Sequence, residues 1–169
     1  AVFYRFIQPG RNHFNAAFCV GTNVVFRRQA VDDIGGMYTG SKSEDVWTSL
    51  MLHERGWRSV YIPDELAVGD APDTIEGFTK QQQRWATGGF EILTTHNPLS
   101  PRRRLTPDQR IMYLVTATHY LAGIAGSSLA QDAPVRRRPS QRRFPVCLLV
   151  LDLTAEQRTE VHAIVTAAW

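Results

Sequence analysis

Segments with strand character alternate with segments that carry helix signals along the first hundred residues, and this alternation limits the folds open to the chain. Residues 20–28 place β-branched and aromatic side chains behind a glycine, which predicts a strand. Residues 29–34 predict a short helix that Gly35-Gly36 would end. A second strand is predicted over 58–62. Strands that alternate with helices indicate an α/β fold.

Two longer helices are predicted from the residues at their ends. One covers about 44–55, and the other starts after Pro72 and runs to about residue 93. Both predictions use capping pairs spaced three residues apart and glycine as a stop signal. These end signals are Ser41 with Glu44, Gly56, and Asp73 with Glu76.

The composition is that of a globular chain with the length of one domain. It has 169 residues, of which 43% are hydrophobic and 21% are charged, with a formal charge of +3. Arginine runs in the C-terminal third carry the positive excess. Such runs can meet nucleic acid, anionic lipid or water, so charge alone assigns no partner and we expect no nucleic acid. The runs are 102–104, 136–138 and 142–143.

The chain divides at two changes in composition, which give the ranges 1–100, 101–130 and 131–169. Residues 101–110 form a basic linker. In the roughly 20 residues that follow, only His119 can carry a charge, and this length would cross a ~30 Å hydrocarbon layer. A buried core helix is the alternative. If the segment is a span, the arginines before it place residues 1–110 in the cytoplasm. The arginine-rich tail over 131–169 has no assigned function.

The acids of Ser43-Glu44-Asp45 lie at the start of a predicted helix. Acids at this position offset the helix dipole by about 0.3–1 kcal/mol, which is explanation enough for their presence. A carboxylate held rigidly at such a site can also act as a general base toward a hydroxyl group. The motif by itself leaves both interpretations open.

Gln81, Arg84 and Trp85 fall within an arc of about 100° on the long predicted helix, so they can face one cleft. A guanidinium pairs with phosphate oxygens, an amide donates and accepts, and an indole face can stack on a sugar ring. The alternative is an ordinary amphipathic helix with Trp85 in the core beside Ile75 and Phe78.

Together, Ser43-Glu44-Asp45 and Gln81-x-x-Arg84-Trp85-Ala-Thr-Gly resemble the (T/S)ED and QxxRW motifs of processive family 2 glycosyltransferases of the cellulose synthase type. The resemblance covers about residues 3–125. It implies that the chain is the C-terminal, acceptor-side half of a GT-A type (Rossmann-like) α/β domain, followed by a transmembrane helix. The chain opens at Ala1 without a signal-like segment, and we expect it to be part of a longer protein.

The resemblance also implies roles for individual residues. Asp45 is the base that activates the acceptor hydroxyl. Gln81 and Arg84 contact the pyrophosphate of the donor, and Trp85 stacks on the terminal acceptor sugar. Further positions that the pattern places at the acceptor or within a motif are Gly21, Thr22 and Glu44.

One position departs from the family pattern. The family's FFCGS reads Phe18-Cys19-Val20-Gly21-Thr22 here, so the cysteine lies one place early. We expect Cys19 to be a buried structural thiol. With only one further cysteine, Cys147, the chain offers no zinc site or disulfide framework.

The partners implied by the resemblance are a UDP-sugar donor, with UDP-glucose as the first candidate, a growing β-linked polysaccharide acceptor and a membrane. A divalent cation, Mg²⁺ or Mn²⁺, is also implied, but the family's DxD ligands lie N-terminal to anything in this sequence. No metal ligand is therefore expected here, and the chain alone is expected to be inactive. The implied location is the bacterial inner membrane, with the catalytic part facing the cytoplasm.

Two other function classes stay open on the residues alone. A glycoside hydrolase could draw its two carboxylates from Glu44, Asp45, Asp64 and Glu65, but it has no use for a phosphate-directed Arg84. A non-catalytic basic module that binds nucleic acid or membrane would rest on the arginines of the tail.

Overall fold

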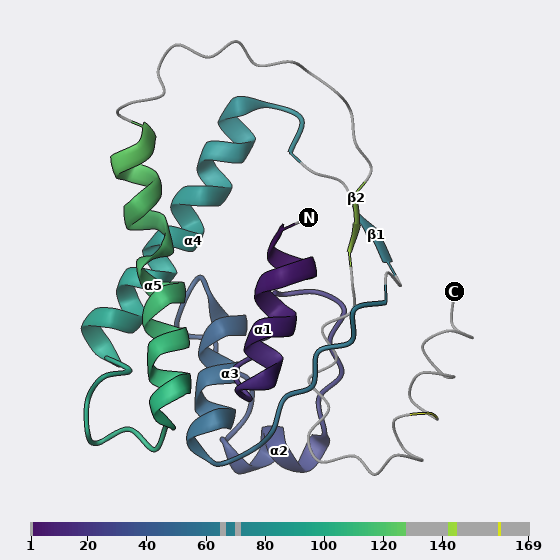
Figure 1. The fold of residues 1–169 in the computed structure, drawn as a ribbon, viewed down its shortest axis with the longest axis vertical. Coiled ribbons are helices and arrows are strands. Elements are labelled where there is room, and N and C mark those ends of the chain that lie inside the picture. Colours follow the sequence, from purple (N-terminus) through teal and green to yellow (C-terminus); the bar gives the residue numbers. More distant parts are fainter. Residues whose placement is uncertain (1, 65–66, 70–71, 128–141, 145–158, 160–169) are drawn as a thin grey trace.

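The computed structural model describes residues 2–64, 67–69, 72–127, 142–144 and 159. Helices dominate this part of the chain, and the longest of them stand side by side (Figure 1). In chain order, the elements are a π-helix over Phe3–Ile7, α1 (Gln8–His13), α2 (Arg28–Asp33), α3 (Glu44–Glu54), β1 (Ala67–Gly69), α4 (Ile75–Thr95), α5 (Pro107–Ser127) and β2 (Arg142–Phe144).

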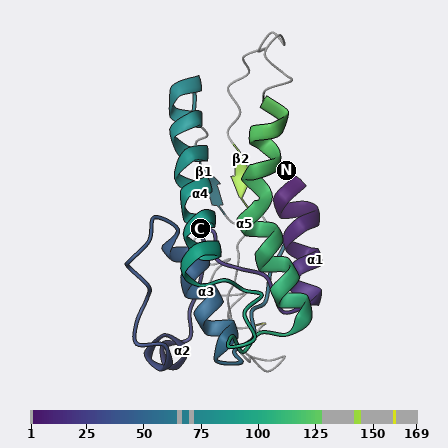
Figure 2. The same cartoon turned by 90° about the vertical axis from the view of Figure 1, so that its left-hand side faces the viewer.

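Helix α3 lies at the centre of the core. Its residue Leu52 belongs to one buried cluster with residues from the segments before and after α3. Trp47 and Leu50 belong to a second cluster with residues of α4, of α5 and of the loop between them. Figure 2 shows α4 and α5 standing next to each other, with α1 beside α5 and α2 at the far end. The other members of the clusters are Ala17, Cys19, Ala30 and Tyr61 in the first, and Ile92, Leu105 and Tyr113 in the second.

Buried polar contacts fix α5 against α3 and α1. The His53 ring hydrogen-bonds through Nδ1 to Tyr113 Oη at 2.7 Å and through Nε2 to Ser59 Oγ at 3.0 Å. Burial lowers the pKa of His53 to about 3, so the ring is neutral in the folded chain. From α1, Arg11 donates to the carbonyl oxygen of Met112 at 2.7 Å and to the Thr116 hydroxyl.

The strand predicted over 20–28 is not formed. Gly21 and Asn23 have φ angles of 80° and 54°, and this left-handed backbone breaks the extended run that a strand needs. The helix predicted after it is present as α2, and positive φ angles at Gly35 and Gly36 end it as expected.

The strand predicted over 58–62 is also not formed, because its backbone groups bond to side chains. The N–H of Ser59 donates to Asn15 Oδ1 and the N–H of Tyr61 donates to Asn12 Oδ1, each at 2.8 Å. These bonds satisfy donors that a neighbouring strand would otherwise take. Within the described residues, the sheet is a short antiparallel pair of β1 and β2, in which Val68 lies opposite Arg143. The predicted alternation of strands and helices is thus wrong in its strands.

The helices predicted over 44–55 and 73–93 are confirmed, but their caps differ. Asp73 does not cap α4: Thr74 Oγ1 accepts from the N–H of Gly77 at 3.1 Å. The Ser41–Glu44 box is not formed either, since Ser41 Oγ accepts from the N–H of Ser43 at 3.1 Å. Gly56 ends α3 with a φ of 83°, as predicted.

The C-terminal predictions are only partly covered by the structure. Helix α5 takes up most of the segment 111–130, and no helix in the described ranges combines the length and the apolar character needed to cross a membrane. Of the tail, β2 pairs with β1. Outside the described residues lie the end of the predicted span at 128–130, the hydrolase candidate Glu65, Cys147, and the tail apart from 142–144 and 159.

Candidate functional site

Asp45 is held rigidly in the first turn of α3. The backbone N–H of Val46 donates to its Oδ1 at 2.7 Å, which satisfies one of the free amide groups at the start of the helix. The Asp45 carbonyl oxygen accepts from Ser49 Oγ at 2.9 Å, and the same hydroxyl accepts from the N–H of Cys19 at 2.9 Å. The carboxylate is therefore fixed to its helix, and the Asp45 backbone is joined through Ser49 to the buried segment that contains Cys19.

The surroundings of Asp45 suit a base that works near neutral pH. Its pKa is raised to about 6, mainly by burial and also by the charge of Glu44, while the Val46 N–H and the charge of Arg84 act in the opposite direction. Above pH 6 the group is mostly ionised and can accept a proton, yet it holds that proton more firmly than an exposed aspartate would.

Gln81 and Arg84 line one hollow of about 350 Å³ at the N-terminal part of α4. Lys80 adds a second cation to this hollow, and its Nζ lies 2.6 Å from Oε1 of Glu76. An arginine, a lysine and an amide grouped within two turns of α4 favour a polyanion such as a diphosphate. The hollow's lining also includes Pro72, Asp73, Thr74 and Gly77.

Arg84 lies close enough to Asp45 for its charge to lower the pKa of the carboxylate, although this is the smallest of the contributions to that pKa. The two residues come from different elements, since Arg84 lies in the middle of α4 and Asp45 lies at the start of α3. The structure thus brings together the two motifs that are about 35 residues apart in the sequence.

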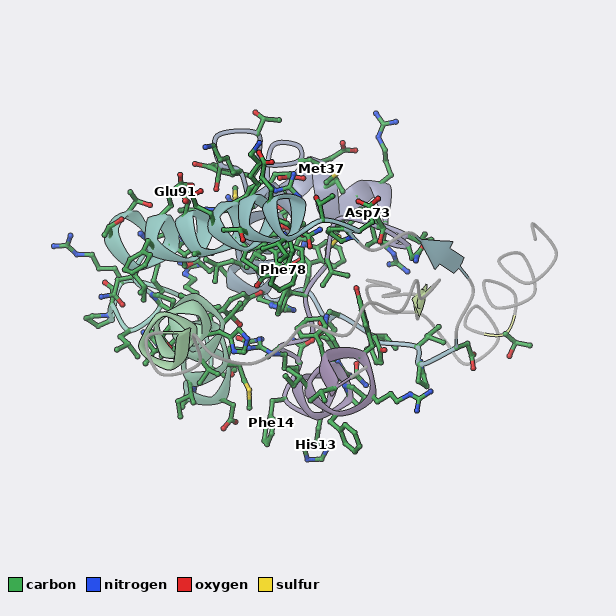
Figure 3. The ribbon with its side chains drawn as sticks, turned by 90° about the horizontal axis from the view of Figure 1, so that it is seen from above. His13, Phe14, Met37, Asp73, Phe78 and Glu91 are labelled. Carbon is green, nitrogen blue, oxygen red and sulfur yellow. The ribbon has the colours of Figure 1, made fainter. Side chains whose placement is uncertain are left out.

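Trp85 is not a core residue: 38% of its surface is exposed. Its proposed core partners are exposed too, Ile75 at 72% and Phe78 at 53%. The interpretation of residues 75–85 as a buried helix face is therefore wrong. Figure 3 shows Phe78 on the side of α4 toward α5 and α1, and Trp85, seven residues on, shares that side of the helix.

The remaining predicted positions differ in how closely they approach Asp45. A Cβ atom added to Gly21 would lie 3.5 Å from Asp45 Oδ2, so this glycine borders the carboxylate. Thr22 follows it and is exposed. Glu44 is also exposed and affects Asp45 through its charge.

Cys19 is a buried thiol, as expected, with 1% of its surface exposed. Its pKa is raised to about 12, mainly by burial and to a smaller extent by the carboxylates of Asp45 and Glu44. A thiol in this environment stays protonated and is a poor nucleophile or metal ligand. Cys19 therefore supports the site through its backbone N–H rather than through its sulfur.

No role for Ser49 was predicted from the sequence. Its hydroxyl joins the Asp45 carbonyl to the Cys19 backbone, and the only sequence signal is its i+4 spacing from Asp45 in a helix.

The described residues contain no group of three histidine, cysteine, aspartate or glutamate side chains that could hold a metal ion. The part of the chain seen in the structure therefore does not fit the divalent cation that the resemblance implies, and no chemical step is assigned to one below.

The chain is similar in sequence to a family of known proteins. A family model described as Glycosyl transferase family group 2 matches residues 2–154. The UDP-forming cellulose synthase catalytic subunit of Xanthomonas axonopodis pv. citri is 35% identical over 123 residues, which make up 73% of this chain and 17% of that protein. Putative cellulose synthase 2 of Komagataeibacter xylinus is 35% identical over 123 residues, 73% of this chain and 8% of its own length.

A third relative gives a similar match over a shorter stretch. A UDP-forming cellulose synthase of Dictyostelium discoideum is 41% identical over 92 residues, which make up 54% of this chain and 9% of that protein. The chain spans at most 17% of the length of these three relatives. Because the family model covers well over half of its residues, the chain belongs to glycosyl transferase family group 2.

Proposed function

We propose that the chain is the acceptor-side part of an inverting glycosyltransferase that transfers a sugar from a UDP-sugar to a growing β-linked polysaccharide. UDP-glucose is the first candidate donor, because the relatives are named as UDP-forming cellulose synthases. Family membership implies a GT-A type fold. Residues 1–100 would be the C-terminal half of that domain, and residues 101–130 would connect it to a membrane.

One observation carries the proposal. The Asp45 carboxylate has a pKa near 6, is bordered by Gly21, and lies within the field of an arginine that lines a cationic hollow. A base, an open approach to it and a phosphate-binding group are what a single displacement at a sugar phosphate requires.

The proposed step is one displacement. Asp45 takes the proton of the acceptor hydroxyl, and the acceptor oxygen forms a bond to the anomeric carbon of the donor sugar. On the opposite face, the bond from that carbon to the diphosphate oxygen breaks, and the departing charge is stabilised by Arg84 and Gln81. Attack opposite the leaving group inverts the anomeric configuration.

Trp85 is assigned to the acceptor. Its indole is partly exposed, so it offers a flat apolar surface that can stack on the C–H face of a sugar ring. A ring held there would orient its hydroxyl toward Asp45.

Two further assignments rest on the resemblance and on the low charge of residues 111–130. We place the working enzyme at the bacterial inner membrane, with this part on the cytoplasmic side. The hydrolase and the basic binding module are not favoured, because neither accounts for a family match across both motifs.

Asp45→Asn in the full-length enzyme tests the proposal. Asparagine keeps the acceptor for the Val46 N–H but is not a base, so we expect transfer from a radiolabelled UDP-sugar to fall about 10²–10⁴-fold, with UDP binding retained. Asp108→Asn, an exposed acid in the first turn of α5, is the matched control and should leave transfer unchanged. Wild-type turnover of Asp45→Asn would reduce Asp45 to a helix-capping residue.

A further inference from the structure

Helix α4 approaches the start of α3 so closely that only glycine fits at the contact. A Cβ atom added to Gly88 would overlap Oγ and Cβ of Ser43 and would lie 3.4 Å from the Ser43 backbone nitrogen. Both residues are buried, with Ser43 6% exposed. Glycine in a helix interior lowers stability relative to alanine. The close contact with Ser43, and not helix formation, therefore accounts for the glycine at position 88.

A second contact holds the same two elements together about one turn further along α4. Ser41 Oγ donates to Oε2 of Glu91 and accepts from the N–H of Ser43 at 3.1 Å. Figure 3 shows Glu91 on the side of α4 toward the segment that carries Met37, away from the side where Phe78 lies. Residues 41–43 are thus fixed to α4 at two points, by van der Waals contact at Gly88 and by a hydrogen bond at Glu91.

The Gly88 contact joins the two elements that carry the candidate site residues. Gly88 follows Gln81 and Arg84 by seven and four residues, which places the three on one face of α4. Ser43 precedes Asp45 by two residues. Any change in the spacing of Gly88 and Ser43 therefore changes the spacing of Arg84 and Asp45.

We propose that Gly88, through its contact with Ser43, is a positioning residue that sets the distance between Asp45 and the Gln81–Arg84 pair. This role rests on the function proposed above, in which one of these groups activates the acceptor and the others hold the leaving diphosphate. A displacement of about 1 Å between groups that act on one reaction centre can lower its rate about 10²-fold.

The test compares Gly88→Ala with the double variant Ser43→Gly/Gly88→Ala in the full-length enzyme. The added methyl group pushes α4 away from residues 41–45, and Ser43→Gly removes both side-chain atoms that it would overlap. Ser43 has a φ of −118°, so glycine there needs no change of backbone. Gly10→Ala, in α1 with nothing within 4 Å of the added atom, is the matched control.

We expect Gly88→Ala to lower kcat per folded molecule about 10²-fold, with the Kd for UDP within about threefold of wild type. We expect kcat to change and the Kd for UDP to stay, because Gln81 and Arg84 move together with α4, whereas Asp45 does not. The double variant should recover most of kcat, and Gly10→Ala should match wild type. Normal kcat in Gly88→Ala would overturn the proposal, and so would a folded double variant that recovers nothing.

Two further measurements keep the proposal testable. If Gly88→Ala does not fold, Ser41→Ala removes the second contact without adding bulk, and it should lower kcat about tenfold with UDP affinity kept; unchanged kcat would overturn the proposal. Asp45→Asn is measured in parallel. Normal transfer by Asp45→Asn would contradict the proposed function itself. If Asp45→Asn is inactive but Gly88→Ala has a normal kcat, only the positioning role is contradicted.

Discussion

Gly21 lies against the carboxylate of Asp45, with 3.5 Å between the position of an added Cβ atom and Oδ2. Its φ angle of 80° falls in the left-handed region, where side chains other than glycine are strained. The residue therefore meets two separate requirements, a backbone turn after the buried segment 16–19 and an open approach to the proposed base.

Substitution at Gly21 separates these two requirements. Gly21→Val should lower stability by about 1–3 kcal/mol through backbone strain, and it should also lower transfer because the larger side chain covers Asp45. Gly56→Val is the control, since Gly56 has a φ of 83° but nothing within 4 Å of an added Cβ. It should lose similar stability and keep its turnover per folded molecule. Equal turnover in both variants would mean that Gly21 serves the backbone alone.

The pH dependence of transfer should report the ionisation of Asp45. Because the proposed base must be deprotonated and burial raises its pKa to about 6, kcat/KM should fall as the pH drops through about 6. Below that pH the decrease should approach tenfold per pH unit. Initial rates from pH 4.5 to 8 would show the acid limb. A limb near pH 4, the ordinary value for aspartate, would contradict the buried environment described for this carboxylate.

Asp45→Asn should stabilise the chain while it removes activity. The pKa of Asp45 is higher in the folded state than in the unfolded state, so the ionised group costs stability above pH 6 and this cost is lost as the pH falls below about 4. Asparagine should therefore raise the free energy of unfolding by up to about 3 kcal/mol at pH 8 and by much less at pH 4.5.

Denaturant unfolding at the two pH values measures this gain. Asp108→Asn is the control with the opposite sign, because an exposed acid in the first turn of α5 interacts favourably with the helix dipole, by about 0.3–1 kcal/mol. A loss of stability in Asp45→Asn at pH 8 would show that the carboxylate is favourable where it lies.

Local signals predicted the helices because their causes lie within a few residues. The glycines at 35, 36 and 56 take positive φ angles and end α2 and α3 where expected. The strands could not be predicted in the same way, since a strand depends on a partner that is distant in sequence. In the segment 58–62 the backbone N–H groups bind the side chains of Asn12 and Asn15 instead, and nothing local to the segment indicates this.

The candidate site was predictable as a set of residues but not as an arrangement. The two motifs predicted roles for Asp45 and Arg84, which stay predictions, and in the structure the charge of Arg84 lowers the pKa of Asp45. The contact between Gly88 and Ser43 joins residues that are far apart in the chain, and a glycine inside a helix signals only that something approaches closely. What approaches could be learned only from the fold.

Trp85 offers the sharpest distinction between packing and binding. Since 38% of its surface is exposed, Trp85→Ala should change the melting temperature by no more than a few degrees. Transfer should fall, because the acceptor ring loses the surface that orients its hydroxyl toward Asp45. Trp85→Phe keeps a smaller flat face and should retain partial activity.

Trp47→Ala provides the matched control for this prediction. Trp47 is 5% exposed and stacks on the ring of Tyr38 with 4.7 Å between the ring centroids, so its loss should cost about 3–5 kcal/mol of folding stability. Thermal unfolding and specific activity are measured on the same preparations of the full-length enzyme. If Trp85→Ala is destabilised as strongly as Trp47→Ala and keeps its turnover per folded molecule, Trp85 has no acceptor role.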